Sequence, residues 1–130
     1  MKVSTQQWLD SAKADLLNCD RILDDDFLTA IVAFHSQQAV EKSFKALIVE
    51  KDLIFPHIHS LIRLHSIIEF ALQQPFDVHE LLTLDNVYTS SRYPGDIGMI
   101  GSGKPTLQEA KEFYESAKRI FEVITDILNQ

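Results

Sequence analysis

Four polar side chains lie close together on a segment that is otherwise apolar. Projected onto a helix at about 100° per residue, they fall within an arc of about 100°; they are Gln37, Gln38, Glu41 and Lys45. Buried polar groups must be paired, because each unpaired one costs about 1–3 kcal/mol. Two explanations are open. Glu41 and Lys45 form a local i,i+4 ion pair on the one solvated face, or all four residues form a polar network at a dimer seam or the floor of a ligand groove.

A second set of functional side chains surrounds Arg92. Residues 88–95 read Tyr-Thr-Ser-Ser-Arg-Tyr-Pro-Gly. An arginine suits bidentate contact with a phosphate or carboxylate, and Tyr88 and Tyr93 can stack on a base. The alternative is structural: Arg92 closes the last carbonyl groups of a helix, and Tyr93 packs on the bundle.

Histidines recur at residues 57–65, but no metal site is predicted there. His57 and His59 have the spacing of a His-x-His site, which would also need carboxylate or thiolate partners at helical spacing, and none is evident. His59 directly precedes a predicted helix and is interpreted as a cap or surface residue. The single cysteine, Cys19, occupies an apolar helix position and is interpreted as a core residue. We therefore expect neither a metal nor a cofactor.

Residues 98–105, Gly-Met-Ile-Gly-Ser-Gly-Lys-Pro, resemble a P-loop without completing it. A P-loop requires Ser or Thr after the lysine to hold magnesium, and a buried strand before the loop. Here Pro105 follows Lys104, and no strand is predicted before the segment. We interpret the segment as a mobile linker. The alternative is that its backbone N–H groups and Lys104 contact a phosphate.

Helices must position all of these side chains. The four glycines fall within residues 95–103, and the rest of the chain lacks glycine, which favours long helices. Apolar residues spaced by three and four predict helices at about 5–23, 27–51, 60 to shortly before Pro75, 78–90 and 106–128. No segment alternates with the period of two that strands show. The predicted fold class is all-α: an antiparallel up-and-down bundle of about five helices in a single domain, residues 1–130.

The same pattern predicts where helices begin and which side chains face inward. Capping boxes, Ser4 with Gln7 and Thr106 with Glu109, are predicted to open the first and last helices. The inner faces of the first and fourth helices are expected to include Trp8, Leu82 and Tyr88.

Composition limits the classes of partner. The net charge of −7 argues against broad, non-specific binding to nucleic acid, which needs a surplus of cations, but it allows a local basic patch. No apolar run approaches the length of about 20 residues that a membrane span needs, and no signal segment opens the chain. We expect a cytoplasmic protein without membrane contact.

These motifs together resemble the HEPN family of small helical domains. Residues 36–47 resemble its QQAxEKxxKAL signature, residues 59–64 its H-x-L-x-x-L element and residues 91–94 its RYP element, while Trp8, Ala12 and Asp15 resemble its first-helix pattern. The resemblance covers nearly the whole chain. It implies a homodimer of five-helix bundles with a nucleotide or RNA groove near the dimer seam. It also implies a minimal nucleotidyltransferase as partner, often in a toxin–antitoxin pair.

One departure from the family decides between its branches. HEPN ribonucleases carry Arg, four to six residues, then His, and none of the four arginines here is followed by a histidine at that spacing. We therefore predict a non-catalytic domain that binds nucleotide, nucleic acid or the partner enzyme. Arg92 and Lys45 would meet phosphate and Tyr93 a base. The predicted nucleotide-binding residues are Gln38, Glu41, Lys45, His59, Arg92 and Tyr93. Two alternatives are a metal-independent ribonuclease with an atypical site, built from His59 or His65 with Arg92, and a ligand-free dimerising scaffold.

Overall fold

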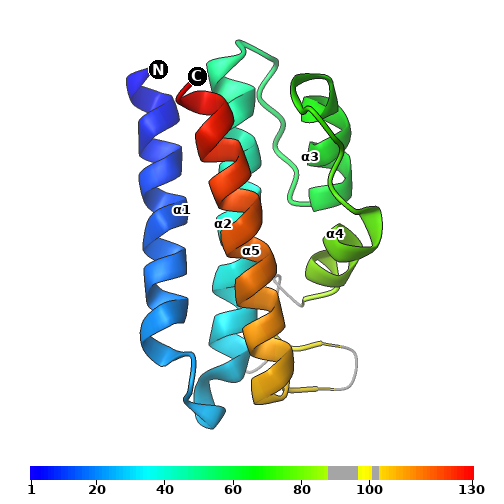
Figure 1. Ribbon diagram of the computed structural model, residues 1–130. Coiled ribbons are helices and arrows are strands. Elements are labelled where there is room, and N and C mark those ends of the chain that lie inside the picture. Colours follow the sequence, from blue (N-terminus) through cyan, green and yellow to red (C-terminus); the bar gives the residue numbers. More distant parts are fainter. Residues whose placement is uncertain (88–96, 101–102) are drawn as a thin grey trace.

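The computed structural model describes residues 1–87, 97–100 and 103–130. These residues form five α-helices: α1 (Val3–Ile22), α2 (Thr29–Glu50), α3 (Leu61–Ile68), α4 (Val78–Asp85) and α5 (Leu107–Leu128) (Figure 1). Two short 3-10 turns, Asp26–Leu28 and Glu69–Ala71, and an isolated bridge between Ile100 and Gly103 complete the regular structure described. The predicted all-α helical bundle is confirmed. None of the described helices is long and apolar enough to cross a membrane.

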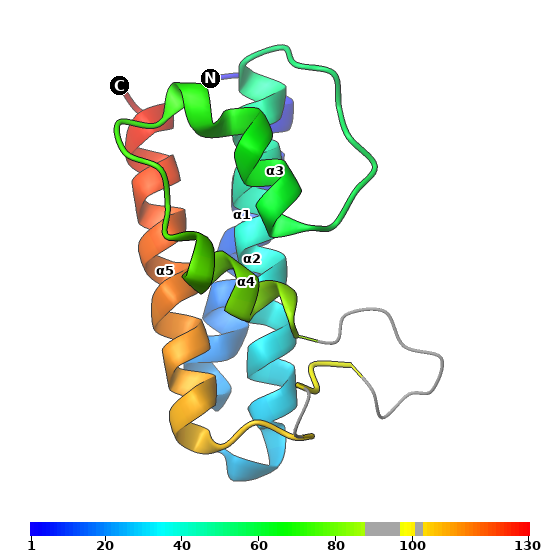
Figure 2. The same ribbon diagram turned by 90° about the vertical axis from the view of Figure 1, so that its right-hand side faces the viewer.

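Three long helices form one layer, and α3 and α4 form a second layer beside α2 (Figures 1 and 2). α1 runs antiparallel to α2. The start of α1 lies beside the end of α2, where the Lys2 backbone N–H donates to Glu50 at 3.0 Å. α5 runs in the same direction as α2, since Ala110 near the start of α5 packs in one buried cluster with Val32 near the start of α2. The long connection through α3 and α4 returns the chain to that end of the bundle and makes this parallel pairing possible.

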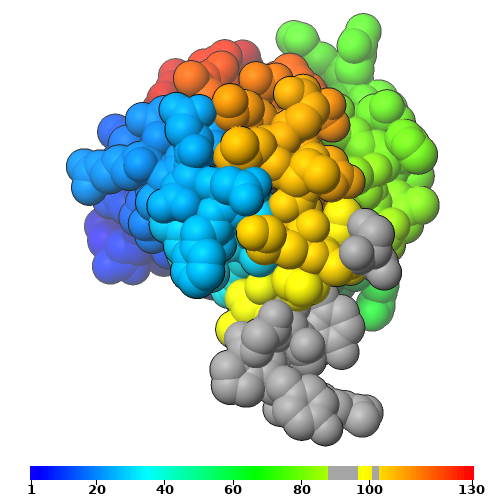
Figure 3. Space-filling view, turned by 90° about the horizontal axis from the view of Figure 1, so that it is seen from below, coloured from blue at the N-terminus to red at the C-terminus, as the bar shows by residue number. Residues whose placement is uncertain are grey.

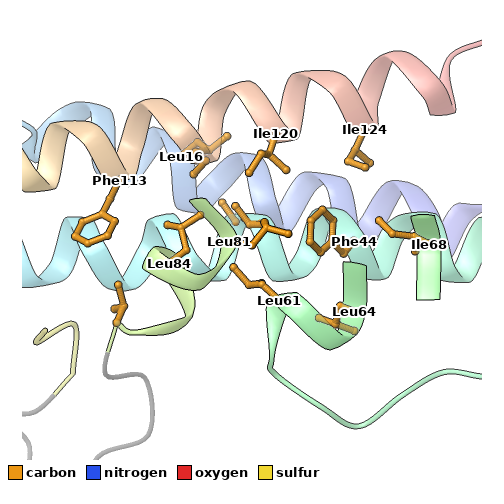
Figure 4. Packing of buried hydrophobic residues seen from close by; sticks show 14 of the residues in the cluster. Leu16, Phe44, Leu61, Leu64, Ile68, Leu81, Leu84, Phe113, Ile120 and Ile124 are labelled. Atoms are coloured by element: carbon orange, nitrogen blue, oxygen red, sulfur yellow. The ribbon is translucent and has the colours of Figure 1, made fainter. Parts of the chain in front are cut away.

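The core lies where the two layers meet (Figure 4). α2 is buried on most sides, as its nearly continuous apolar sequence predicts. Its Phe44 faces Leu61 and Leu64 of α3 on one side and Ile120 and Ile124 of α5 on another, within a single cluster. This central position of α2 explains why polar side chains on it must be paired.

The two predicted capping boxes have different outcomes. The Thr106–Glu109 box is confirmed: Glu109 N–H donates to the Thr106 hydroxyl at 3.1 Å, and Thr106 N–H donates to the Glu109 carboxylate at 2.9 Å. The Ser4–Gln7 box is wrong, because α1 begins at Val3 and Ser4 lies inside the helix. One backbone donor at this end, the Lys2 N–H, finds a tertiary partner in Glu50 of α2, which also accepts from the Thr5 hydroxyl.

The fourth helix is shorter than predicted. α4 ends at Asp85, and Leu82 is 47% exposed although it was expected to face inward. Leu81 and Leu84 are the buried residues of α4. These two leucines, three residues apart, attach α4 to the bundle. Tyr88 lies outside the described residues. The Asp85 carboxylate accepts from the backbone N–H groups of Leu61 and Ile62, at 2.7 and 3.1 Å, which ties the end of α4 to the start of α3.

The described part of the glycine-rich segment is packed, so its interpretation as a mobile linker is wrong there. Gly98 has φ of +78°, and a Cβ at this position would lie 1.7 Å from the Ala30 carbonyl oxygen. Lys104 Nζ donates to the Asp26 backbone oxygen at 2.8 Å. Seen from this end of the bundle, the first residues of α5 lie against the turn between α1 and α2 (Figure 3). Lys104 therefore links the segment before α5 to the turn between α1 and α2.

Candidate functional site

The side chain of Glu41, on the middle of α2, holds a polar cluster together. Its Oε2 accepts from Lys45 Nζ at 3.0 Å and lies 3.2 Å from Nδ1 of His59. Its Oε1 accepts from Gln37 Nε2 at 3.4 Å. The predicted i,i+4 ion pair is confirmed, but its placement on a solvated face is wrong. Only 6% of the Glu41 side chain and 7% of the Lys45 side chain are exposed.

An aromatic pair covers the ammonium group of Lys45. Trp8 of α1 and Phe55 of the connection after α2 stack with ring centroids 5.6 Å apart. Lys45 Nζ lies 5.8 Å from the Trp8 ring centre and 5.7 Å from that of Phe55, at distances where a cation is attracted to ring faces. Glu41 and the two rings thus engage Lys45, and contact with a phosphate would require the rings to move.

His59 is the accessible member of the cluster. Its side chain is 77% exposed, and its Nδ1 faces Glu41. Ser60, and not His59, caps α3, because the Ser60 hydroxyl accepts from Arg63 N–H. The expectation of a surface residue therefore holds and that of a cap does not. A buried carboxylate beside Nδ1 fixes the ring and leaves Nε2 available to a ligand.

The structure brings together four of the six predicted site residues. Gln38 joins Glu41, Lys45 and His59 through Gln37, whose Oε1 accepts from Gln38 Nε2 at 2.7 Å. The other two, Arg92 and Tyr93, lie outside the described residues.

Sequence reasoning missed the aromatic side of the site. Trp8 was expected on the inner face of the first helix, but it is half-buried and stacks on Phe55. His57 lies edge-on to Phe55 with a centroid separation of 5.7 Å, which extends the aromatic surface toward His59. The available signal was the placing of Phe55, His57 and His59 at alternate positions of the short connection after α2.

The comparisons with known proteins agree with this architecture. The profile of the HEPN domain family matches residues 5–127. The chain belongs to the HEPN domain family. Its fold is similar to the crystal structure of ST0689, an archaeal HEPN homologue, with 27% identity and a TM-score of 0.72. That match covers 97% of this chain and 98% of the homologue. A search of curated proteins gives no match.

This HEPN domain contains a second ion cluster that sequence reasoning also missed. Asp15 of α1 lies 2.7 Å from Nδ1 of His35 and 2.8 Å from Nζ of Lys42, both on α2. The carboxylate is buried, while the histidine and lysine side chains are 26% and 22% exposed. The seven-residue spacing of His35 and Lys42, two helical turns, was the available signal.

Two other titratable groups of the HEPN domain, His65 and Cys19, are buried. His65 Nε2 accepts from Phe76 N–H at 3.0 Å, and burial lowers the pKa of His65 while Glu69 opposes the shift. Burial raises the pKa of the Cys19 thiol to about 11. His65 has no free basic nitrogen for catalysis, because Nε2 is already an acceptor. Within the described ranges, no three His, Cys, Asp or Glu side chains are grouped to hold a metal ion.

Proposed function

We propose that this HEPN domain is a non-catalytic module that binds a nucleotide or a nucleic acid at the Glu41–His59 cluster. One observation carries the proposal: an exposed imidazole, His59, is fixed by a buried carboxylate beside a surface of stacked aromatic rings. A nucleotide can use both features at once. A ring face stacks on a base, and an imidazole N–H contacts a phosphate or ribose oxygen.

The charge of the cluster supports a small contact rather than a broad one. Lys45 is paired with Glu41 and buried, and His59 is the most exposed polar group of the cluster. A few polar contacts and stacking fit a single nucleotide or a short unpaired strand. Arg92 and Tyr93 remain proposed as further ligands for the phosphate and the base, and Gln38 as an amide contact beside them.

The single tryptophan of the chain provides a direct test. Trp8 belongs to the aromatic surface, so a base that stacks there should change its emission. Titration with each of the four ribonucleotides and a short single-stranded RNA would be followed by Trp8 fluorescence. We expect saturable quenching by one ligand, weakened about tenfold or more in His59→Ala, the loss of a hydrogen bond to a charged group.

His79→Ala is the matched control, because His79 is an exposed histidine at the start of α4. The proposal predicts unchanged affinity in this variant. Equal affinity of His59→Ala and the parent protein would reject the site, and the absence of quenching with every ligand would reject nucleotide binding there.

A ribonuclease is the second candidate, because the Glu41–His59 pair has the geometry that a general base needs. When Nδ1 carries the proton and donates to Glu41, Nε2 keeps the lone pair that could accept a proton from a ribose hydroxyl. His65 is no longer a candidate base because of its bond to Phe76. A time course of RNA cleavage decides: cleavage by the parent protein and none by His59→Ala would make the domain an enzyme.

The proposal includes a homodimer and a minimal nucleotidyltransferase as partner, in a toxin–antitoxin-type pair. Two exposed apolar side chains support the dimer. Phe27, in the 3-10 turn before α2, is 83% exposed, and Ile31, in the first turn of α2, is 38% exposed. A contact with a second copy of the chain would remove these two apolar side chains from water. Sedimentation of the parent protein and of Phe27→Glu would test this: a dimer that the substitution converts to monomer supports the proposal, and a monomeric parent rejects it.

A further inference from the structure

Two hollows lie along α5, on the side that faces α4 and the segment before it. The smaller, of about 200 Å³, is lined by α4 and the first half of α5. The larger, of about 670 Å³, is lined by residues 71–77 and the second half of α5. Glu80 of α4 lines both hollows, so they adjoin at this residue, and together they are called the groove. In Figure 2 the chain before α4 descends beside α5, and α4 then starts beside α5 and runs across the bundle toward α2.

The groove carries a strong excess of negative charge. Its described lining contains one cation, Arg119, which is paired with Glu80. The carboxylates that line it are Asp77, Glu80, Glu109, Glu112 and Asp126. Carboxylates gathered along one cleft focus a negative potential there, which attracts cationic ligands and repels phosphates. This face is therefore unsuited to the nucleotide or nucleic acid proposed for the Glu41–His59 cluster.

The floor of the groove is apolar. Leu84 and Phe113 form the floor of the smaller hollow, and Phe76, Val123 and Ile127 contribute to the larger. Val123 is 38% exposed in the middle of α5, although neighbouring Ile120 and Ile124 are fully buried. An apolar floor between acidic rims complements an amphipathic helix with apolar anchors on one side and cations at its edges.

The length of the groove fits such a helix. The α5 residues that line it extend from Glu109 to Ile127, which is most of the helix of 22 residues. At about 1.5 Å per residue this is about 27 Å, the length of a helical segment of about 18 residues. We propose that the α4–α5 groove is a docking surface for a basic, amphipathic helical segment of a partner protein.

A designed peptide tests the proposal before the partner is known. The probe is a fluorescein-labelled peptide of about 18 leucines and lysines, arranged so that the leucines occupy one helical face. Fluorescence anisotropy with the full chain should show saturable binding that weakens as salt is added. Two comparison peptides, one with glutamate in place of every lysine and one with serine in place of every leucine, should bind at least about tenfold more weakly.

Charge reversal on the protein localises the contact. Glu112→Lys with Asp126→Lys changes two exposed carboxylates of the groove. Asp10→Lys with Glu122→Lys changes two exposed carboxylates outside it. The pairs are matched, because Glu112 and Asp10 each accept a hydrogen bond from the glutamine four residues earlier. We expect the groove pair to weaken peptide binding at least about tenfold and the control pair to change it less than about twofold.

The outcomes separate the proposal from its competitors. Equal weakening by both pairs would show attraction to the net charge of −7 alone and would overturn the proposal, as would absence of binding to the parent protein. RNA binding that is lost only in the groove pair would overturn it in favour of a nucleic-acid surface. Thermal melting of both variants shows that each is folded. The Trp8 titration shows whether nucleotide binding at the Glu41–His59 cluster stands or fails separately.

Discussion

Two buried carboxylates, Glu41 of α2 and Asp15 of α1, each hold one lysine and one histidine, but the settings of their partners differ. At Glu41 the lysine, Lys45, is sealed beneath the rings of Trp8 and Phe55. The histidine, His59, comes from the connection after α2 and is 77% exposed. The cluster thus has a fixed interior and one group that a ligand can reach.

At Asp15 both partners come from the same helix. His35 and Lys42 are two turns apart on α2, and the carboxylate between them belongs to α1. The cluster joins two packed helices, and both partners are partly exposed to a similar degree. The same three functional groups therefore make a helix–helix clamp in one place and a candidate ligand site in the other. The difference is whether the histidine lies on a rigid helix or on a connection that presents it to solvent.

The largest expected effect comes from removing each carboxylate. Glu41→Ala leaves Lys45 buried without its counter-ion, and we expect a loss of about 3 kcal/mol in the free energy of unfolding. This is the low end for a broken buried pair, because two rings still face the ammonium group. Asp15→Ala should cost about 1–2 kcal/mol, since its partners can turn toward water. Urea denaturation measures both values.

A double variant distinguishes lost attraction from an unpaired charge. Glu41→Gln with Lys45→Met removes both charges, and we expect it to be more stable than Glu41→Ala. Similar losses for Glu41→Ala and Asp15→Ala would contradict the distinction between the clusters.

The next effect concerns the histidines. His35→Ala should lower the free energy of unfolding by about 1 kcal/mol, because a hydrogen bond between α1 and α2 is lost, and it should leave ligand affinity unchanged. His59→Ala should do the reverse, with little change in stability and a loss of ligand binding. Chemical denaturation and Trp8 titration on the same two variants measure the four values. If His35→Ala reduced binding as strongly as His59→Ala, the two clusters would share one function.

The smallest effect is confined to acid pH and concerns His65, whose Nε2 accepts from a backbone N–H and does not face a carboxylate. The pKa of His65 in the folded protein lies below the ordinary value of 6.5, chiefly because the ring is buried. The unfolded chain therefore binds the proton more readily. The contribution of a neutral His65 to the free energy of unfolding is fully present above about pH 6.5, and it is lost as pH falls through the folded-state pKa.

His65→Gln keeps an acceptor for Phe76 N–H but does not titrate, so it should be less sensitive to acid than the parent protein. Urea midpoints at a series of pH values give the comparison. Identical slopes in the two proteins would assign the acid sensitivity to other groups.

Local features of the fold could be predicted from the sequence. The last helix was predicted to within one residue at its start, because Thr106 and Glu109 satisfy each other's backbone donors without help from elsewhere. The first helix was predicted with the wrong cap, because it begins at Val3 and the Lys2 N–H before it bonds to Glu50, which is distant in sequence. The exposure of Leu82 also depended on how α4 docks, which its own spacing left open.

The candidate site divides in the same way. Gln37, Gln38, Glu41 and Lys45 could be grouped from sequence, because helical geometry fixes their relative directions. Trp8 could not be placed with them, since it reaches the cluster only when α1 packs against α2.

The sequence by itself determined the helices, the family pattern and the polar arc on α2, because each depends on residues that are neighbours along the chain. Only the tertiary structure decided that Glu41 and Lys45 of that arc are buried and that their solvent-facing neighbour, His59, comes from the connection after α2. Burial depends on how α1 and the connection after α2 pack over Glu41 and Lys45, and these long-range contacts leave no fixed spacing in the sequence. The acidic groove has the same origin, since its carboxylates come from α4, α5 and the segment before α4, and only packing brings them together.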